Sequence, residues 1–225
     1  MDEINVHTLA ALPYSYHALE PALERRVVEG HHARHNAELV RARNEAERAL
    51  ARWPSRGAGP EAERLLALKR RYPALASATV LHEIYWGNMH PAGRRRPTGD
   101  LKVRLEHEFG SYEGWVDEFV ATAMAPEAGW ALLVHDPSDH RLRNVVVEGH
   151  DRGAVWGAWV LVACDVWEHA YYKQYGSQRG EYARAFLDLL EWETIADAYY
   201  RSPYGNARSA AEAAGEHRLA PLPFG

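Results

Sequence analysis

Two side chains four residues apart carry the clearest chemical signal in the sequence. Asp165 and His169 enclose the tripeptide Val-Trp-Glu, and a carboxylate and an imidazole at this spacing can face one centre where a strand ends and a helix begins. A structural alternative is equally simple, with an aspartate that caps the helix and a partly buried histidine behind it. Taken alone, the pair leaves a metal site and a structural role open.

Two further histidines, His31 and His82, lie on stripes whose other members are mostly apolar. An imidazole in such a place needs a partner, because an unpaired buried polar group is costly. A lone inward histidine is usually hydrogen-bonded in the core. Two of them on facing helices can instead converge with Asp165 and His169, and three neutral nitrogens plus one carboxylate suit iron or manganese.

The segments around these histidines predict two antiparallel helices. The first runs from Pro21 to about Trp53, with an inward stripe of Leu23, Val27, His31, His35, Leu39, Ala42, Ala46 and Leu50. The two prolines and two glycines of residues 54–60 end it. A second helix is predicted over 61–71 and is interrupted at Pro73, after which Leu75, Ala78, His82 and Trp86 form another inward stripe.

The second half of the chain predicts a mixture of helices and short strands. Residues 91–99 indicate a linker, and residues 101–125 are helical with a break at 109–111. Three β-type runs follow at 129–134, 143–147 and 158–162, and helices are expected after Asp165 through Tyr172 and over 181–199.

The expected fold class is therefore α+β: an N-terminal antiparallel helical hairpin, then a C-terminal layer of helices and a three-stranded antiparallel sheet in meander order. We expect a hairpin domain at 1–90, an α/β domain at 91–200 and a flexible tail at 201–225.

Composition excludes several classes of function. The net charge of -5 mixes both signs, which argues against a nucleic-acid partner and favours a small-molecule substrate. No run of about 18 apolar residues occurs, so no membrane partner is expected. The single cysteine, Cys164, excludes an intrachain disulfide and a cysteine-cluster zinc site, and it favours a cytoplasmic location.

Three motifs give the chain a resemblance to a known family. The segments 12–16 (LPYSY), 29–35 (EGHHARH) and 165–172 (DVWEHAYY) are similar to those of iron/manganese superoxide dismutases, and the resemblance covers roughly residues 10–200. It implies that His31, His82, Asp165 and His169 are the ligands of one iron or manganese ion per chain, with solvent at a fifth position. The implied reaction is disproportionation of superoxide to oxygen and hydrogen peroxide.

The resemblance also implies roles for the surroundings of the metal. Trp130 and Trp167 would form walls of the site, and His150 would occupy the position of a glutamine that often faces the bound solvent. His35, His150 and Tyr172 would act in catalysis, with Tyr172 approaching His35 of a neighbouring copy. Glu168 would pair with the neighbour's His169, so a homodimer or homotetramer is expected.

The chain also departs from the family pattern near the metal. Leu39 stands where a tyrosine usually gates the substrate channel, residues 77–81 replace a glycine-rich segment before the second ligand, and Leu132 replaces an aromatic residue. Three readings follow: a divergent superoxide dismutase, a repurposed metal-dependent oxidase or oxygenase acting on a small organic substrate, and a metal-binding homologue without turnover. The choice between iron and manganese stays open, because the outer positions are Ala78 and His150.

Overall fold

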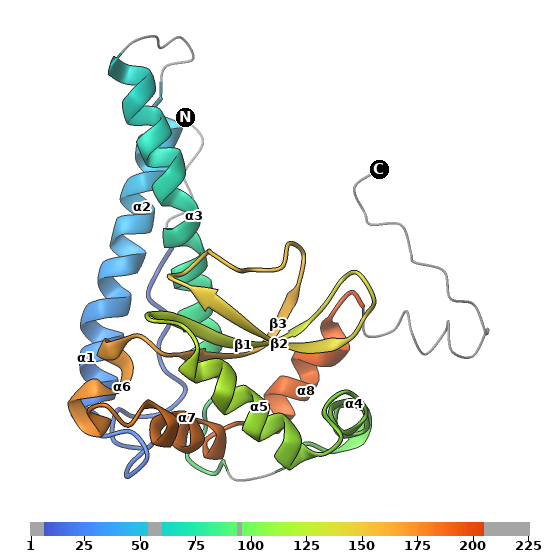
Figure 1. The fold of residues 1–225 in the computed structure, drawn as a ribbon. Helices are drawn as coiled ribbons and strands as arrows, with labels where there is room; N and C mark the ends of the chain where they lie inside the picture. The colour runs from blue at the N-terminus through green and yellow to red at the C-terminus, as the bar shows by residue number, and fades with distance from the viewer. Residues whose placement is uncertain (1–6, 54–59, 94–95, 205–225) are drawn as a thin grey trace.

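The N-terminal half is a long helical hairpin. The computed structural model describes residues 7–53, 60–93 and 96–204 of the 225-residue chain. Within these, α1 (Arg25–Gly30), the π-helical turn η1 (His31–Asn36) and α2 (Ala37–Ala51) form one helical arm. The second arm is α3 (Pro60–Gly87), which runs back beside α2 (Figure 1). The hairpin was predicted from periodicity, whereas its predicted loop at 54–60 lies almost wholly outside the described residues.

The π-helical turn changes which residues of the first arm are buried. The predicted stripe holds at Leu23, Val27 and His31, but His35 and Leu39 are only half-buried. The turn residue Asn36 is buried, and so are Val40 and Asn44 of α2, none of which the stripe contained, whereas Ala46 is buried as predicted. A π turn takes up more residues than an α turn. The buried face of α2 is therefore displaced by about one residue from the face that a regular period of 3.6 predicts.

The predicted interruption at Pro73 is wrong, because α3 continues through this residue from Pro60 to Gly87. Proline has no N–H to donate to the carbonyl of Lys69 one turn earlier. Pro73 is exposed, so water can satisfy that carbonyl. The stripe that follows was predicted correctly, since Leu75, Ala78, His82 and Trp86 are all buried.

Three antiparallel strands form the sheet: β1 (Gly129–His135), β2 (Leu142–Glu148) and β3 (Trp159–Asp165). The predicted meander order is wrong, because the strand order is β2-β1-β3. A short turn after His135 joins β1 to β2, whereas the longer connection over 149–158 carries the chain back to the other edge of β1. Pairing of β1 with β3 sets Trp130 opposite Asp165.

Helices surround this sheet (Figure 1). α4 (Gly99–Phe109) and α5 (Tyr112–Met124) contact β2, and α5 also contacts β1. The predicted break between them is confirmed: Gly110 has a positive φ of 79°, and Ser111 accepts a hydrogen bond from the N–H of Gly114. α6 (Glu168–Tyr175) follows β3 directly and contacts α1.

The single helix predicted over 181–199 is wrong, since two helices occupy this region. They are α7 (Arg179–Asp188) and α8 (Trp192–Arg201). The break between them pairs with the end of α3: the N–H of Glu191 donates to the carbonyl of Asn88, and the N–H of His90 donates to the carbonyl of Leu189. These long-range bonds replace the helical ladder.

Asn88 also bonds the end of α3 to β3, the strand that ends at Asp165. The side chain of Asn88 is buried, donates to the carbonyl of Leu161 at 2.9 Å and accepts from the N–H of Ala163 at 2.9 Å. Both partners lie in β3, shortly before Asp165. The asparagine therefore sets the position of this strand relative to α3, which carries His82.

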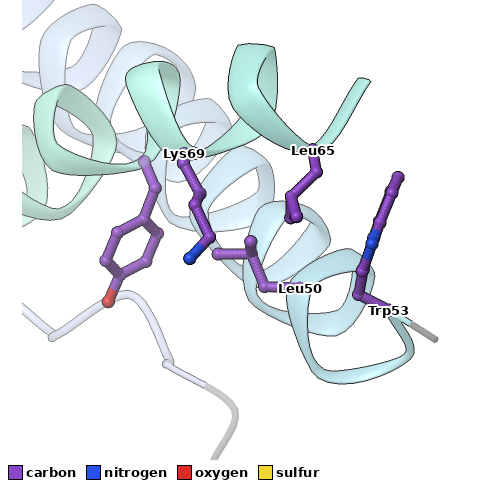
Figure 2. A pocket seen from close by; sticks show the side chains of 5 residues that line it. Leu50, Trp53, Leu65 and Lys69 are labelled. Carbon is purple, nitrogen blue, oxygen red and sulfur yellow. The ribbon is translucent and has the colours of Figure 1, made fainter. Parts of the chain in front are cut away.

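The outer end of the hairpin holds a pocket of 440 Å³ that is separate from the candidate site residues. Figure 2 shows Leu50 and Trp53 of the first arm facing Leu65 and Lys69 of α3, and Tyr72 completes the lining.

No described helix combines the length and the apolar character needed to cross a membrane. The predicted tail over 201–225 lies outside the described residues from 205 onward, and the hydroxyl of Tyr204 donates to the carbonyl of Gly157 at 2.6 Å.

Candidate metal centre

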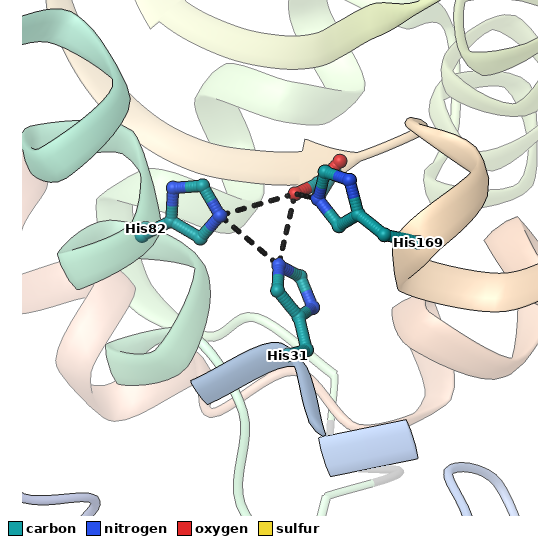
Figure 3. A group of neighbouring side chains, drawn as sticks. His31, His82 and His169 are labelled. Atoms are coloured by element: carbon teal, nitrogen blue, oxygen red, sulfur yellow. Dashed lines mark hydrogen bonds and ion pairs between the residues drawn. The ribbon is translucent and has the colours of Figure 1, made fainter. Parts of the chain in front are cut away.

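Four elements deliver the four predicted ligands to one point. His31 opens the π-helical turn η1, His82 lies near the end of α3, Asp165 is the last residue of β3 and His169 lies in the first turn of α6. Figure 3 shows the imidazole rings of His31, His82 and His169 directed toward one another. Residues separated by up to 138 positions thus converge, as the sequence predicted.

The donor atoms face a common centre at close range. The Oδ2 atom of Asp165 lies 3.2 Å from Nε2 of His31, 3.2 Å from Nε2 of His169 and 3.4 Å from Nε2 of His82. The Nε2 atoms of His31 and His82 are 3.0 Å apart. One ligand atom from each residue lies within 4.8 Å of every other.

Hydrogen bonds orient two of these ligands. The Nδ1 atom of His82 lies 2.7 Å from the main-chain oxygen of Ala78. A carbonyl can only accept, so Nδ1 carries the proton and the lone pair of Nε2 faces the centre. The Oδ1 atom of Asp165 accepts the N–H of Trp167 at 2.9 Å, which leaves Oδ2 for the three imidazoles.

Burial favours the neutral form of His31 and His82, whereas interactions with neighbouring histidines favour the ionised form of Asp165. Burial lowers the pKa of His31, and it lowers the pKa of His82 to about 3. Burial alone would raise the pKa of Asp165, but the charge and the hydrogen bonds of His169 and His31 hold it well below its usual range. Neutral imidazoles and an ionised carboxylate are the protonation states that a metal ion requires.

The donor set fits iron or manganese. Three imidazole nitrogens and one carboxylate oxygen suit these ions, whereas a cage of oxygen atoms would suit magnesium or calcium. Unlike an ordinary core histidine, the side chain of His82 brings its Nε2 to 3.0 Å from another imidazole nitrogen while both pKa values are lowered. A cation at the centre would give both nitrogens a partner.

The predicted catalytic residue His35 lies against the outer side of this centre. Its ring centroid is 3.8 Å from that of His169 and 5.8 Å from that of His31. Burial lowers the pKa of His35 to about 4, and the neighbouring His169 makes the second-largest contribution in the same direction. Its Nε2 atom is buried and has no hydrogen-bond partner among the described residues.

The predicted catalytic residue His150 lies on the opposite flank, in the turn after β2. Its Nδ1 atom accepts the indole N–H of Trp130 at 3.1 Å, and its ring stacks on Trp167 at 5.1 Å. The ring of Trp130 in turn meets His82 edge-on at 5.0 Å. Trp130 and Trp167 therefore lie where the resemblance implied walls of the site.

The third predicted catalytic residue, Tyr172, does not enter the centre of its own chain. It lies on α6 and is 54% exposed. Glu168, at the start of the same helix, is also exposed. Both residues are available to a neighbouring molecule.

Two residues of the site were not identified from the sequence. The hydroxyl of Tyr182 in α7 donates to the main-chain oxygen of Asp165 at 2.7 Å, and the hydroxyl of Tyr85 in α3 lies 3.2 Å from that of Tyr182. Both tyrosines belong to apolar helical stripes, where an aromatic residue indicates only the core. No short-range pattern could have distinguished them.

Comparisons with known proteins agree with this geometry. The family model of the α-hairpin domain of iron/manganese superoxide dismutases matches residues 6–90, and the model of their C-terminal domain matches residues 97–198. A manganese superoxide dismutase of Haloarcula marismortui is 42% identical over 90% of this chain and 98% of its own length.

Two further relatives, one similar to this chain to the same degree and one less similar, are also named as superoxide dismutases. A manganese superoxide dismutase of Haloferax volcanii is 44% identical over 86% of this chain and 95% of its own length. A probable iron superoxide dismutase of Bacillus subtilis is 35% identical over 84% of this chain and 66% of its own length. With both domain models matched and such relatives over most of its length, the chain belongs to the iron/manganese superoxide dismutase family.

Proposed function

We propose that this protein disproportionates superoxide to oxygen and hydrogen peroxide, using one metal ion held by His31, His82, Asp165 and His169. The observation that carries the proposal is the convergence of these four donor atoms within 4.8 Å. When bound there, iron or manganese supplies a one-electron couple that superoxide can both reduce and oxidise. Membership of the family supports the same reaction.

The residues of the chain prepare the site for this ion. The bond from Nδ1 of His82 to Ala78 holds the ring with Nε2 inward, and the negative charge of Asp165 offsets part of the positive charge of the metal. The buried walls exclude bulk water, since His82, Trp130 and Asp165 have no exposed surface.

Formation of peroxide also consumes two protons per turnover, and His150 is the group best placed to hold one. Its Nδ1 accepts from Trp130, so in the neutral ring the proton resides on Nε2. Burial lowers the pKa of His150, which keeps the neutral form with a single ring proton. We propose His150 and His35 as the proton-holding groups that flank the ion.

Manganese is the ion that we propose for the native protein. The relatives of 42–44% identity are named as manganese enzymes, whereas the relative named as a probable iron enzyme is 35% identical. Elemental analysis of protein purified without added metal tests the choice. Superoxide-consumption assays of the manganese and iron forms then test the function, and turnover no faster than that of the free metal salts in both forms would refute it.

We further propose that the active unit is a homodimer, or a homotetramer built from such dimers. Tyr172 and Glu168 are exposed beside the metal centre, the side chain of His169 is 27% exposed, and the buried Nε2 of His35 has no described partner. A second copy that covers this face would bury these groups and offer a hydroxyl to His35. Sedimentation of the metal-loaded protein tests this assembly.

A cytoplasmic location completes the proposal. Cys164 is the single cysteine of the sequence and is buried at the end of β3, which is compatible with a reducing compartment. Cell fractionation followed by immunodetection tests this placement.

A pocket beside His150 supports a second candidate function, that of a metal-dependent oxidase. It has a volume of 300 Å³ and is otherwise lined by small and apolar side chains of α3, the sheet and the loop after β2. An apolar organic substrate could bind there within reach of His150. Oxygen uptake by the metal-loaded protein in the presence of small phenols, without superoxide, would favour an oxidase over a dismutase.

A further inference from the structure

Two buried phenol groups, one on α3 and one on α7, connect these helices to the main chain of Asp165. We propose that Tyr182, supported by Tyr85, is a positioning residue that sets the orientation of Asp165 and thereby the affinity and the electronic structure of the metal centre. This inference rests on the proposed metal site, but not on the identity of the substrate.

The hydroxyl groups form a chain with a defined direction. Tyr182 donates its only hydroxyl proton to the main-chain oxygen of Asp165, at 2.7 Å. Its oxygen can then only accept from the hydroxyl of Tyr85, which lies 3.2 Å away. The chain therefore runs from α3 through α7 to the end of β3, with every hydroxyl proton used.

Core filling alone does not account for these hydroxyls. Tyr182 has no exposed surface and Tyr85 is 1% exposed, and phenylalanine would fill nearly the same volume without a polar atom to desolvate. Burial raises the pKa of both phenols well above the usual range, so both remain protonated donors. Their bonds are directed at the main chain of a metal ligand.

Asp165 is held from three sides as a result. Tyr182 binds its carbonyl, the N–H of Trp167 binds its Oδ1, and the following N–H of Val166 donates to the carbonyl of Gly129 at 3.0 Å. These bonds determine the orientation of the peptide and of the carboxylate, and they leave Oδ2 directed at the three imidazoles. Of these three bonds, only the one from Tyr182 is donated by a residue within a helix, and Tyr182→Phe would remove it.

Tyr85 links the same chain to a second ligand. Its ring packs against His31 with centroids 5.5 Å apart and stacks on Phe186 of α7 at 5.5 Å. Tyr85 also follows His82 by one helical turn on α3. The pair Tyr85 and Tyr182 thus couples the position of Asp165 to that of two histidine ligands.

The test compares two hydroxyl deletions in neighbouring tyrosines whose hydroxyls donate to different main-chain oxygens. Tyr182→Phe removes the donor to Asp165. The matched control is Tyr175→Phe, which removes a hydroxyl that donates to the main-chain oxygen of Ala22 at 2.6 Å and whose ring lies 5.8 Å from that of Tyr182. Manganese affinity is measured by competition with a chelator, and the electron paramagnetic resonance spectrum of the loaded protein is recorded together with the melting temperature of the metal-free form.

Tyr182→Phe should weaken manganese binding by about tenfold, in the range found when partners of metal ligands are removed, and should change the spectrum. Tyr175→Phe should leave affinity and spectrum unchanged even where it lowers the melting temperature equally. Equal affinities and identical spectra for Tyr182→Phe and the wild type would overturn the proposal, as would the same change in Tyr175→Phe.

A second variant keeps the test decisive if Tyr182→Phe does not fold. Tyr85→Phe leaves the bond from Tyr182 to Asp165 in place but removes its support, so a smaller loss of affinity with an altered spectrum is expected. An unchanged spectrum in a folded Tyr85→Phe protein would count against the proposal. Because no superoxide is used, a failure here is distinguishable from a lack of dismutase activity, and a wild type without manganese binding would refute the metal site itself.

Discussion

The Nδ1 atom of His82 lies 2.7 Å from the main-chain oxygen of Ala78, one turn earlier on α3. This bond decides which nitrogen of the ring carries the proton, and so Nε2 is free to face Asp165 and His31. The helix that carries the ligand therefore also sets its tautomer. Several expectations depend on this arrangement.

Removal of His82 should abolish metal retention. His82→Ala deletes one of four converging donors and leaves Asp165 and two histidines, which cannot complete the ligand set. Elemental analysis should show a fall from one ion per chain to a small fraction. His32→Ala is the control, because His32 is also buried but bonds to the carbonyl of Ala10 at 2.9 Å. Full occupancy in His82→Ala would exclude this residue as a ligand.

The metal-free protein should lose stability as the pH falls below about 6.5, the usual pKa of histidine. Burial lowers the pKa of His82 to about 3, so between the two values the unfolded chain binds more protons than the folded one. The free energy of unfolding then decreases with falling pH in this window. Asp165, whose pKa is held down, acts in the same direction at lower pH.

Urea unfolding of the metal-free protein across this range measures the effect. His82→Gln removes one of the titrating groups and should make the decrease shallower. A wild type whose midpoint does not move between neutral and mildly acidic pH would show that His82 titrates normally in the folded state.

Glu168→Ala should weaken both association and metal retention. The residue is exposed at the start of α6, next to the ligand His169, and the dimer that we propose would pair it across the interface. Sedimentation velocity and elemental analysis check the two effects, with the exposed Glu181 of α7, as Glu181→Ala, for comparison. A wild type that sediments as a monomer at micromolar concentration while fully metallated would rule out the proposed dimer.

Asn88→Ala should destabilise the fold by about 2–6 kcal/mol, because two buried main-chain groups of β3 lose their partners and each such loss costs about 1–3 kcal/mol. The bonds to Leu161 and Ala163 are the ones removed. Chemical denaturation measures the change. Asn144→Ala removes a half-buried side chain that bonds to the side chains of Trp115 and Glu118 and to no main-chain group of the sheet. It should cost less, and equal losses would show that Asn88 contributes no special anchoring.

Leu39→Tyr tests the missing gate. Leu39 is half-buried on α2, one turn after His35, and its orientation toward the metal cavity stays a prediction. A phenol there should increase superoxide turnover by about 2–10-fold at high pH, a fraction of the full effect of a positioned proton donor. It should impair catalysis if the space serves an organic substrate. Unchanged activity, metal content and optical spectrum would show that Leu39 does not face the cavity.

The sequence alone predicted the four side chains that converge, and the order of most elements. Asp165 and His169 stand in a motif of eight residues, and the inward stripe that carries His82 is regular, so short-range patterns were enough to identify them. The same holds for the three strands, whose β-branched runs are bounded by turns. Such features depend on neighbours in the chain.

Other features of the protein depend on the tertiary structure and could not be predicted from neighbouring residues in the chain. At the π-helical turn His31–Asn36, the buried face of the first arm shifts from His35 and Leu39 to Asn36 and Val40. The helix α3 continues through Pro73. Strand order follows from which edge of β1 remains free after β2 has paired. Tyr182 acquired its place at the metal centre only because α7 packs where its hydroxyl meets Asp165. Each outcome depends on contacts between distant segments, whose free energies outweigh local preference and leave no mark in a single sequence.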